Sequence, residues 1–362
     1  MNKKVLFYFD CIILTSRAID LIKFLQYKLG FDIYFHEIDD QSKWILMNLH
    51  RYNDIKIWNK NDINQFEIVF YDNTSWEHGM SKINDYVKSF KNKLVCINYE
   101  DGYEFYLHNV EQYTIDKTLM FINNALYVDR NRYIEQIRNK LFLTTSYITN
   151  SQLFKNKAIN INNKKSRIYF TGSLTGNPSR LTNFSDSEKY FRYNLVKKIY
   201  NNKKYNSYLK FFNYDPSYKN FFDNVIENEL KGNTSKYHSS EEYSNMMIES
   251  MFCIAVKGNS FPTNRLHESQ AAGCISITNN FDTEVEIYGV GKNEESYLEI
   301  KIDLSDLEEK IDYCINNIDF AQNIMYNSRK NWETYNMLDE EGLYSPVTQK
   351  YHTDAFKKYG LI

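Results

Sequence analysis

The chain has 362 residues with a formal net charge of −2; 43% are apolar and 25% charged, as in an ordinary folded protein. The length favours two domains over one core, and the balanced charge gives no electrostatic basis for binding nucleic acid. Its five cysteines are scattered, with no Cys-x-x-Cys pair, which argues against a disulfide framework or a zinc site.

The N-terminal part alternates short apolar runs with helical patterns. Its beginning imitates a signal peptide, but Asp10 interrupts the apolar run and no cleavage site follows, so we interpret Val5–Phe9 as a first strand. Further strands are expected at Asp32–Glu37, Ile55–Ile57, Phe66–Tyr71 and Leu94–Asn98, with helices at Ser16–Leu29, Gln41–Arg51 and Trp76–Phe90. Strands that alternate with helices of this length predict a parallel sheet.

A second alternating series follows a break in the pattern. The helical region Asp129–Ser151 leads into Lys155–Ser166, a polar segment without a period that we interpret as a linker. Strands are then expected at Arg167–Phe170, Leu209–Asn213, Phe252–Val256, Cys274–Thr278 and Tyr297–Ile302. Helices are expected at Ser187–Tyr200, Tyr218–Leu230, Glu241–Ser250, Asn264–Ala272 and Phe320–Thr334. A further helix, capped by Asp303 or Ser305, is expected to end near Asn317.

This organisation predicts an N-terminal domain over residues 1–154, a linker over 155–166, a C-terminal domain over 167–340 and a tail over 341–362 without a resolved period. No stretch approaches the roughly 20 apolar residues of a membrane span. We expect a cytoplasmic protein, with peripheral attachment to a membrane left open.

The segment Met251–Ile277 is the most informative part of the chain. It predicts a buried strand, a turn containing Lys257 and Gly258, a helix capped by Thr263 or Asn264, and a second strand. The helix carries Arg265 and Glu268 three residues apart, hence on one face near its positive end. A glycine turn, a free helix end, an arginine and a carboxylate form a plausible seat for a nucleotide diphosphate and its ribose.

This segment resembles the signature of exostosin-type glycosyltransferases. The matching residues are Ser250, Phe252, Cys253, Gly258, Arg265, Glu268, Gly273, Cys274 and Ile275, whereas Ser276 stands where the pattern has proline. Arg167–Gly172, followed by Arg192, is a weaker match. The resemblance implies an α/β protein of the GT-B fold, with two Rossmann-like domains facing a cleft and a tail that crosses back to the first domain. It implies transfer of a sugar from a nucleotide sugar, with a UDP-sugar as the first expectation, to a glycan or other hydroxyl acceptor.

Within that resemblance, Arg265 would bind the phosphates, with help from Lys257, Gly258 and the start of the helix at Thr263 and Asn264. Glu268 would bind the ribose hydroxyls, the role of the family's glutamate. The turn at Gly172 and Ser173 would approach the donor, together with Arg192 or Arg180. The sequence has no Asp-x-Asp triplet, so we expect no metal and no other cofactor.

The catalytic base is less well defined. The candidates are carboxylates that follow strands of the first domain, where ligands of parallel sheets bind. We rank Asp101 and Glu100 first and Asp72 second, and Asp10 and Glu37 are the other candidates. A carboxylate base would favour inversion, although the residues do not decide between inversion and retention.

Competing interpretations stay open. Arg265 and Glu268 could be only a surface ion pair, and the chain could be an epimerase of nucleotide sugars, or a catalytically inactive glycan- or nucleotide-binding protein of the same fold. A NAD-dependent enzyme is disfavoured because no G-x-G-x-x-G follows the first strand.

Overall fold

The architecture is that of a computed structural model, which describes residues 3–8, 18–36, 40–48, 52–60, 62–72, 87–98, 111–123, 137–144, 148–172, 174, 190–211, 239–256, 263–279 and 288–362. The chain forms two compact units. The first comprises Met1–Tyr147, Asp282–Gly289 and Thr334–Ile362, and the second comprises Ile148–Phe281 and Val290–Glu333. Residues 155–166 therefore lie within the second unit.

The first unit is built on a six-stranded parallel sheet in the order β2-β1-β3-β4-β5-β6. The strands are β1 (Lys4–Tyr8), β2 (Asp32–Phe35), β3 (Ile68–Asp72), β4 (Lys93–Asn98), β5 (Thr118–Asn123) and β6 (Leu141–Leu143). Val5 in β1 lies opposite Ile33 in β2 and Ile68 in β3. The central strand β1 is buried from Val5 to Tyr8, as expected where helices cover a parallel sheet on both faces, whereas β2 at the edge alternates between half-buried and buried residues.

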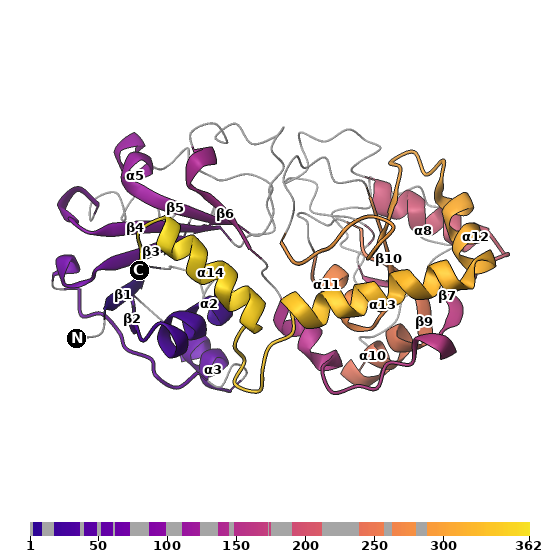
Figure 1. The fold of residues 1–362 in the computed structure, drawn as a ribbon, viewed down its shortest axis with the longest axis horizontal. Coiled ribbons are helices and arrows are strands. Elements are labelled where there is room, and N and C mark those ends of the chain that lie inside the picture. The colour runs from indigo at the N-terminus through magenta and orange to yellow at the C-terminus, as the bar shows by residue number, and fades with distance from the viewer. Residues whose placement is uncertain are drawn as a thin grey trace. The chain divides into compact units, whose positions relative to one another are not determined.

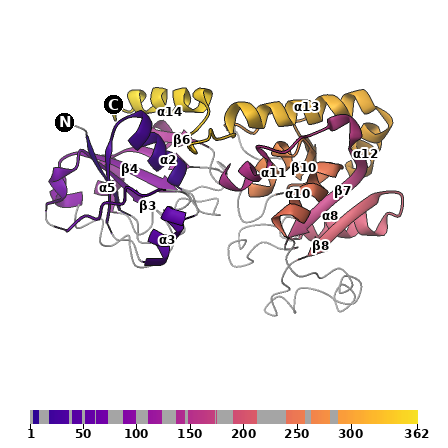
Figure 2. The ribbon, with the colours of Figure 1, turned by 90° about the horizontal axis from the view of Figure 1, so that it is seen from below.

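The helices of the first unit include one that comes from the C-terminal end of the chain. They are α2 (Ile19–Lys23), which continues as the π-helical turn η1 (Phe24–Lys28), α3 (Asp40–Asn48), α5 (Gln112–Lys117), α14 (Pro346–Lys358) and the 3₁₀ turns η2 (Ile63–Gln65) and η5 (Arg138–Lys140). Helix α14 lies beside α2 (Figures 1 and 2), where the rings of Phe356 and Phe24 are 6.2 Å apart. The hydroxyl groups of Tyr351 in α14 and of Tyr359 at its C-cap donate hydrogen bonds to carbonyl oxygens of β6.

The second unit has a five-stranded parallel sheet in the order β11-β10-β9-β7-β8. The strands are β7 (Lys165–Gly172), β8 (Asn206–Phe211), β9 (Ser250–Ile254), β10 (Ile275–Asn279) and β11 (Leu298–Ile300). The helical elements are α8 (Phe191–Asn201), α10 (Ser240–Glu249), α11 (Asn264–Ala271), α12 (Leu307–Asn316), α13 (Ile318–Tyr335), η6 (Ile148–Phe154) and η7 (Ile161–Asn163).

Alternate side chains of β7 face the two sides of this sheet. Ile168 and Phe170 join a core with residues of α8 and α12, whereas the ring of Tyr169 meets that of Tyr243 in α10 at 6.1 Å.

The α/β class with two parallel sheets, predicted from the sequence, is confirmed. Within the described ranges, no helix combines the length and apolar character needed to cross a bilayer.

Some expected elements are wrong. The region interpreted as a helix over 129–151 contains β6 and two 3₁₀ turns, and β5 was not expected. Helix α12 begins at Leu307 with Asp306 in the N-cap position, rather than at Asp303 or Ser305. The segment Ile55–Ile57 provides an isolated bridge, Ile57 to Phe35, rather than a strand. The helix expected over Tyr218–Leu230 lies outside the described residues.

Candidate functional site

The order of the second sheet reverses at β7. From β7 the chain reaches β8 on one side and later returns through α10 to β9 on the other side. In open parallel sheets, ligands bind beyond the carboxyl ends of the strands at such a reversal. At this edge β7 ends with Thr171 and Gly172, and α11 begins after β9. The topology therefore indicates where a ligand site of this unit should lie.

Gly172 and Arg265 lie side by side at the end of β7. Its φ angle is +152°, a conformation that residues with a side chain rarely adopt. A Cβ atom at Gly172 would lie 3.5 Å from Nη2 of Arg265 and 3.6 Å from the Phe170 ring. Nη1 of Arg265 donates a hydrogen bond to the carbonyl oxygen of Thr171. The structure thus brings together Gly172 and Arg265, which are far apart in the sequence.

Arg265 is the second residue of α11, and its side chain is only 21% exposed. Its guanidinium lies 5.8 Å from the centre of the Phe170 ring and 5.7 Å from that of Tyr243, both distances at which cation–π attraction acts. Burial alone lowers the pKa of Arg265, but Tyr243 and Glu268 outweigh burial and raise the pKa above its usual value. Arg265 is therefore a permanent cation.

Glu268 is held on two sides. Its Oε2 atom lies 3.6 Å from Nε of Arg265 and accepts a hydrogen bond from the Tyr243 hydroxyl. Burial first, and the Glu268 carboxylate in addition, raise the pKa of Tyr243, although Arg265 acts in the opposite direction. Tyr243 consequently remains protonated and is a donor. The other carboxylate oxygen, Oε1, makes no hydrogen bond to the described residues.

Arg192, the second residue of α8, contributes a further positive charge to this region. Burial lowers its pKa to about 10, and the charge of Arg265 adds to the effect. The group still carries its charge at neutral pH. The two guanidinium groups therefore lie close enough to repel each other, and both add positive charge to this part of the second unit.

The start of α11 has polar atoms without partners. Thr263 occupies the N-cap position but its side chain makes no capping hydrogen bond. Its Oγ1 atom, and Oδ1 of Asn264, are buried and have no partner among the described residues. The helix was expected to be capped by one of these side chains, and neither caps it. Because no side chain caps the helix, its first backbone N–H groups stay available, and such groups are common seats for anions.

His267 is adjacent to this group but faces the interior. It is fully buried, neither ring nitrogen has a hydrogen-bond partner within the described residues, and burial lowers its pKa to about 4. It is therefore neutral at physiological pH and inaccessible to a ligand.

Several predicted site residues lie outside the described part of the chain. They are Glu100, Asp101, Ser173, Arg180, Lys257 and Gly258, and also Asp10 and Glu37 among the remaining candidate bases. Asp72 is the last residue of β3, in register with Ile97, at the carboxyl edge of the first sheet; its side chain is not described. The sequence assigned no role to Tyr243 or to the Thr171 carbonyl, which both hold the site.

No protein-family model and no curated protein matches the chain. It resembles solved structures over nearly its full length. HepE of Anabaena in complex with UDP has a TM-score of 0.60 at 8% identity, covering 99% of this chain and 100% of that one. A glycosyltransferase of Rickettsia africae has a TM-score of 0.57 at 12% identity, covering 99% and 98%. A UDP-N-acetylglucosamine 2-epimerase has a TM-score of 0.51 at 10% identity, covering 100% and 98%.

These likenesses establish the fold. The chain has the α/β GT-B fold, as the sequence predicted, and this fold is shared by glycosyltransferases and epimerases. The narrower resemblance to the exostosin type has no family match to support it and stays a prediction.

Proposed function

We propose that this protein is a glycosyltransferase that moves a sugar from a nucleotide-diphosphate sugar to a hydroxyl group of a glycan. One observation carries the proposal: at the reversal of the second sheet, Gly172, Arg265 and Glu268 converge around the start of α11. The fold adds support, because HepE, which shares it, was solved with UDP.

The donor would bind with its diphosphate at Arg265 and Arg192. When the bond between the sugar's anomeric carbon and the diphosphate breaks, its electron pair passes to the diphosphate, which gains negative charge. Two fixed guanidinium groups can stabilise this charge without a metal ion. Lys257, Gly258, Ser173 and Arg180 remain candidates for further contacts, with UDP as the favoured nucleotide.

Glu268 would bind the ribose. Its Oε1 atom is available to accept hydrogen bonds from ribose hydroxyls, while Tyr243 and Arg265 fix the position of Oε2. Tyr243→Phe should therefore weaken nucleotide affinity by about tenfold, the value of one hydrogen bond to a charged group. The measurement is titration calorimetry with UDP.

A carboxylate of the first unit would take the proton of the acceptor hydroxyl as its oxygen attacks the anomeric carbon, with inversion. Asp101 is the first candidate, followed by Glu100 and Asp72. Asp101→Asn should lose turnover and keep donor affinity. An active Asp101→Asn enzyme would move the assignment to Asp72.

The deciding experiment is thermal-shift screening of the protein against UDP, GDP, CDP, CMP and their common sugars. A ligand that binds the folded state alone raises stability, by about 2.7 kcal/mol at a hundredfold excess over its dissociation constant. Stabilisation by one nucleotide that is lost in Glu268→Gln or Arg265→Ala supports the proposal. No stabilisation by any of them would favour an inactive glycan-binding protein.

The likeness to a UDP-N-acetylglucosamine 2-epimerase makes epimerisation the second candidate. It is separated from transfer by incubating a bound nucleotide sugar without an acceptor. An epimerase converts the sugar to its C2 epimer under these conditions, whereas a transferase needs a hydroxyl acceptor for efficient turnover.

A further inference from the structure

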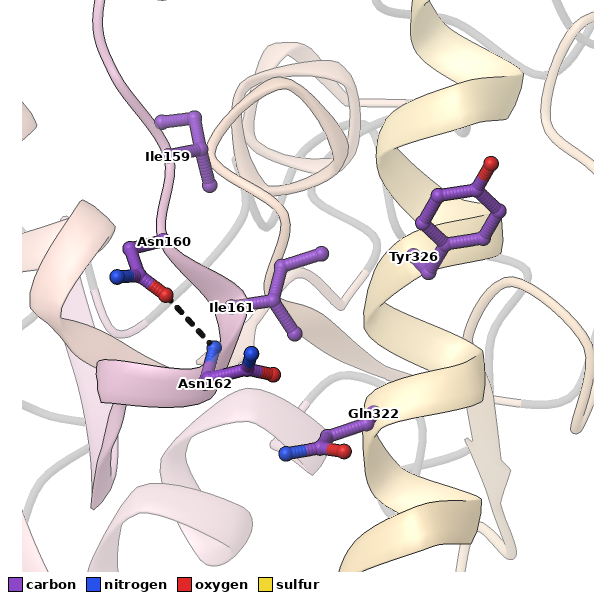
Figure 3. Close-up of a pocket in the computed structure, with 6 residues that line it drawn as sticks. All are labelled: Ile159, Asn160, Ile161, Asn162, Gln322 and Tyr326. Carbon is purple, nitrogen blue, oxygen red and sulfur yellow. Dashed lines mark hydrogen bonds between the residues drawn. The ribbon is translucent and has the colours of Figure 1, made fainter.

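A pocket of about 530 Å³ opens on the second unit away from Arg265. Its size falls within the range, on the order of 300–1,000 Å³, of small-molecule sites. The segment that leads into β7 forms one wall and α13 the other (Figure 3). The lining residues are Ile159, Asn160, Ile161, Asn162, Gln322 and Tyr326.

This pocket lies at the amino edge of the second sheet. Residues 159–162 precede β7, and a Cβ atom on Gly273, just before β10, would lie 3.1 Å from Cγ2 of Ile159 and 3.8 Å from Cγ1 of Ile161. Arg265 lies at the other end of β7, beside Thr171. Eight residues of strand span roughly 25 Å, so the pocket is separate from the candidate diphosphate site.

Both walls of the pocket rest on the residues that end α11. Ile159 and Ile161 lie beside Gly273, and α13 is hydrogen-bonded to this region. Arg329, on α13, donates hydrogen bonds to the carbonyl oxygens of Ala271, at the end of α11, and of Phe154. Trp332, one turn further along α13, donates to Oγ of Ser151 at 2.8 Å. A pocket whose walls are already held in place requires little ordering when a ligand binds.

The described lining mixes carboxamide side chains with isoleucine and tyrosine side chains and carries no charged group. Within the described residues, the carboxamides of Asn162 and Gln322 make no hydrogen bond, and Figure 3 shows these two side chains reaching toward each other across the pocket. Oδ1 of Asn160 accepts a hydrogen bond from the main-chain N–H of Asn162 at 3.1 Å, which leaves the side-chain NH₂ group of Asn160 as a donor. Tyr326 is 57% exposed, and Nζ of Lys330 lies 6.0 Å from the centre of its ring.

This chemistry matches a sugar. A carboxamide both donates and accepts hydrogen bonds, as each sugar hydroxyl does, and the C–H face of a sugar ring can pack on Tyr326 and on the isoleucine side chains. Among the residues that the structure describes, no carboxylate, lysine, arginine or histidine lines the pocket to compensate a ligand's charge. We infer that this pocket binds a neutral oligosaccharide. The inference goes beyond the proposed function and does not depend on it, because no residue of the diphosphate site takes part.

The test is binding of the full-length protein to an array of neutral and acidic glycans, with affinities for the hits measured by saturation-transfer NMR. We expect binding to one or more neutral oligosaccharides. Tyr326→Ala, which removes the ring, and Gln322→Glu, which replaces the donor NH₂ by an oxygen, should each weaken it about tenfold. Tyr326→Phe, which keeps the ring, should lose less.

The matched control is Tyr313→Ala on α12, since Tyr313 is 53% exposed but does not line the pocket. It should leave glycan affinity unchanged. Arg265→Ala should also keep glycan binding while losing nucleotide binding, so failure of one proposal is distinguishable from failure of the other. The inference is overturned if no neutral glycan binds, if only acidic glycans bind, or if binding survives both Tyr326→Ala and Gln322→Glu.

Discussion

Removing the Arg265 side chain should destabilise the second unit as well as weaken nucleotide binding, because the guanidinium is part of the folded framework. It donates to the Thr171 carbonyl oxygen and lies 3.6 Å from the Glu268 carboxylate. Arg265→Ala leaves this carbonyl without its donor. It also leaves a carboxylate that is only 10% exposed without its cation, although Tyr243 still donates to it.

The size of the effect follows from these two losses. A hydrogen bond from a charged donor contributes about 1.5–3 kcal/mol. The unpaired carboxylate adds about 1 kcal/mol, less than for a fully buried ion because Tyr243 still donates and water reaches part of the side chain. The sum is about 3 kcal/mol. At about 2–4 °C per kcal/mol for a unit of this size, the melting temperature should fall by about 6–12 °C.

Combining Arg265→Ala with a second substitution, Glu268→Gln, separates the lost hydrogen bond to Thr171 from the cost of the unpaired carboxylate. In the double variant no carboxylate is left unpaired, so its destabilisation should be smaller than the sum of the single variants by about 1 kcal/mol. Differential scanning calorimetry of the four proteins measures this, and nucleotide binding should be tested below the lowest melting temperature. An Arg265→Ala protein that melts like the wild type would refute the described role of the guanidinium, and strict additivity would refute the coupling.

Three further results are expected. His352 is fully buried, and burial lowers its pKa from the usual 6.5 to about 4. As the pH falls, the unfolded chain therefore takes up a proton on His352 before the folded chain does, and the first unit should lose up to about 3 kcal/mol of stability between pH 6.5 and 4. Melting scans against pH should show a smaller loss in His352→Gln. Nζ of Lys164 donates to three carbonyl oxygens, so Lys164→Met should cost about 2–4 kcal/mol in urea unfolding, whereas Lys165→Met, which removes an exposed ion pair, should cost under about 1 kcal/mol. Sugar transfer should continue in EDTA; complete loss that added metal restores would contradict stabilisation by arginines alone.

The strands that the sequence predicted correctly are those with long apolar runs between clear turn signals, such as β1, β4 and β7. Strand β6 has only three residues, Leu141–Leu143, too few to display a period. Helix α14 was not predicted because its buried face contains polar residues. Thr348 donates to the Tyr335 carbonyl oxygen and His352 hydrogen-bonds to Thr144, so these side chains are satisfied only in the folded protein.

The candidate site was predictable to the extent that local spacing determined it. Arg265 and Glu268 are three residues apart on a helix, and the structure shows them as a pair. Their partners come from distant elements: Tyr243 from α10, and a main-chain carbonyl of β7 that has no signature in a sequence. The role of Tyr243 could not be predicted, because its hydrogen bond to Glu268 joins two helices that are separate in the sequence, α10 and α11.

The choice between Arg180 and Arg192, which the sequence left open, bears on what this site can bind. Arg192 lies within electrostatic range of Arg265, since the charge of Arg265 contributes to its lowered pKa. Glu268 is the carboxylate that pairs with Arg265, and the lowered pKa of Arg192 indicates that the two guanidinium groups repel each other. The repulsion between them is a cost that a ligand with two or more negative charges would remove on binding. A nucleotide diphosphate has such charge, whereas a neutral sugar does not, and this is why we assign the diphosphate to the carboxyl edge of the sheet and the neutral glycan to the amino edge.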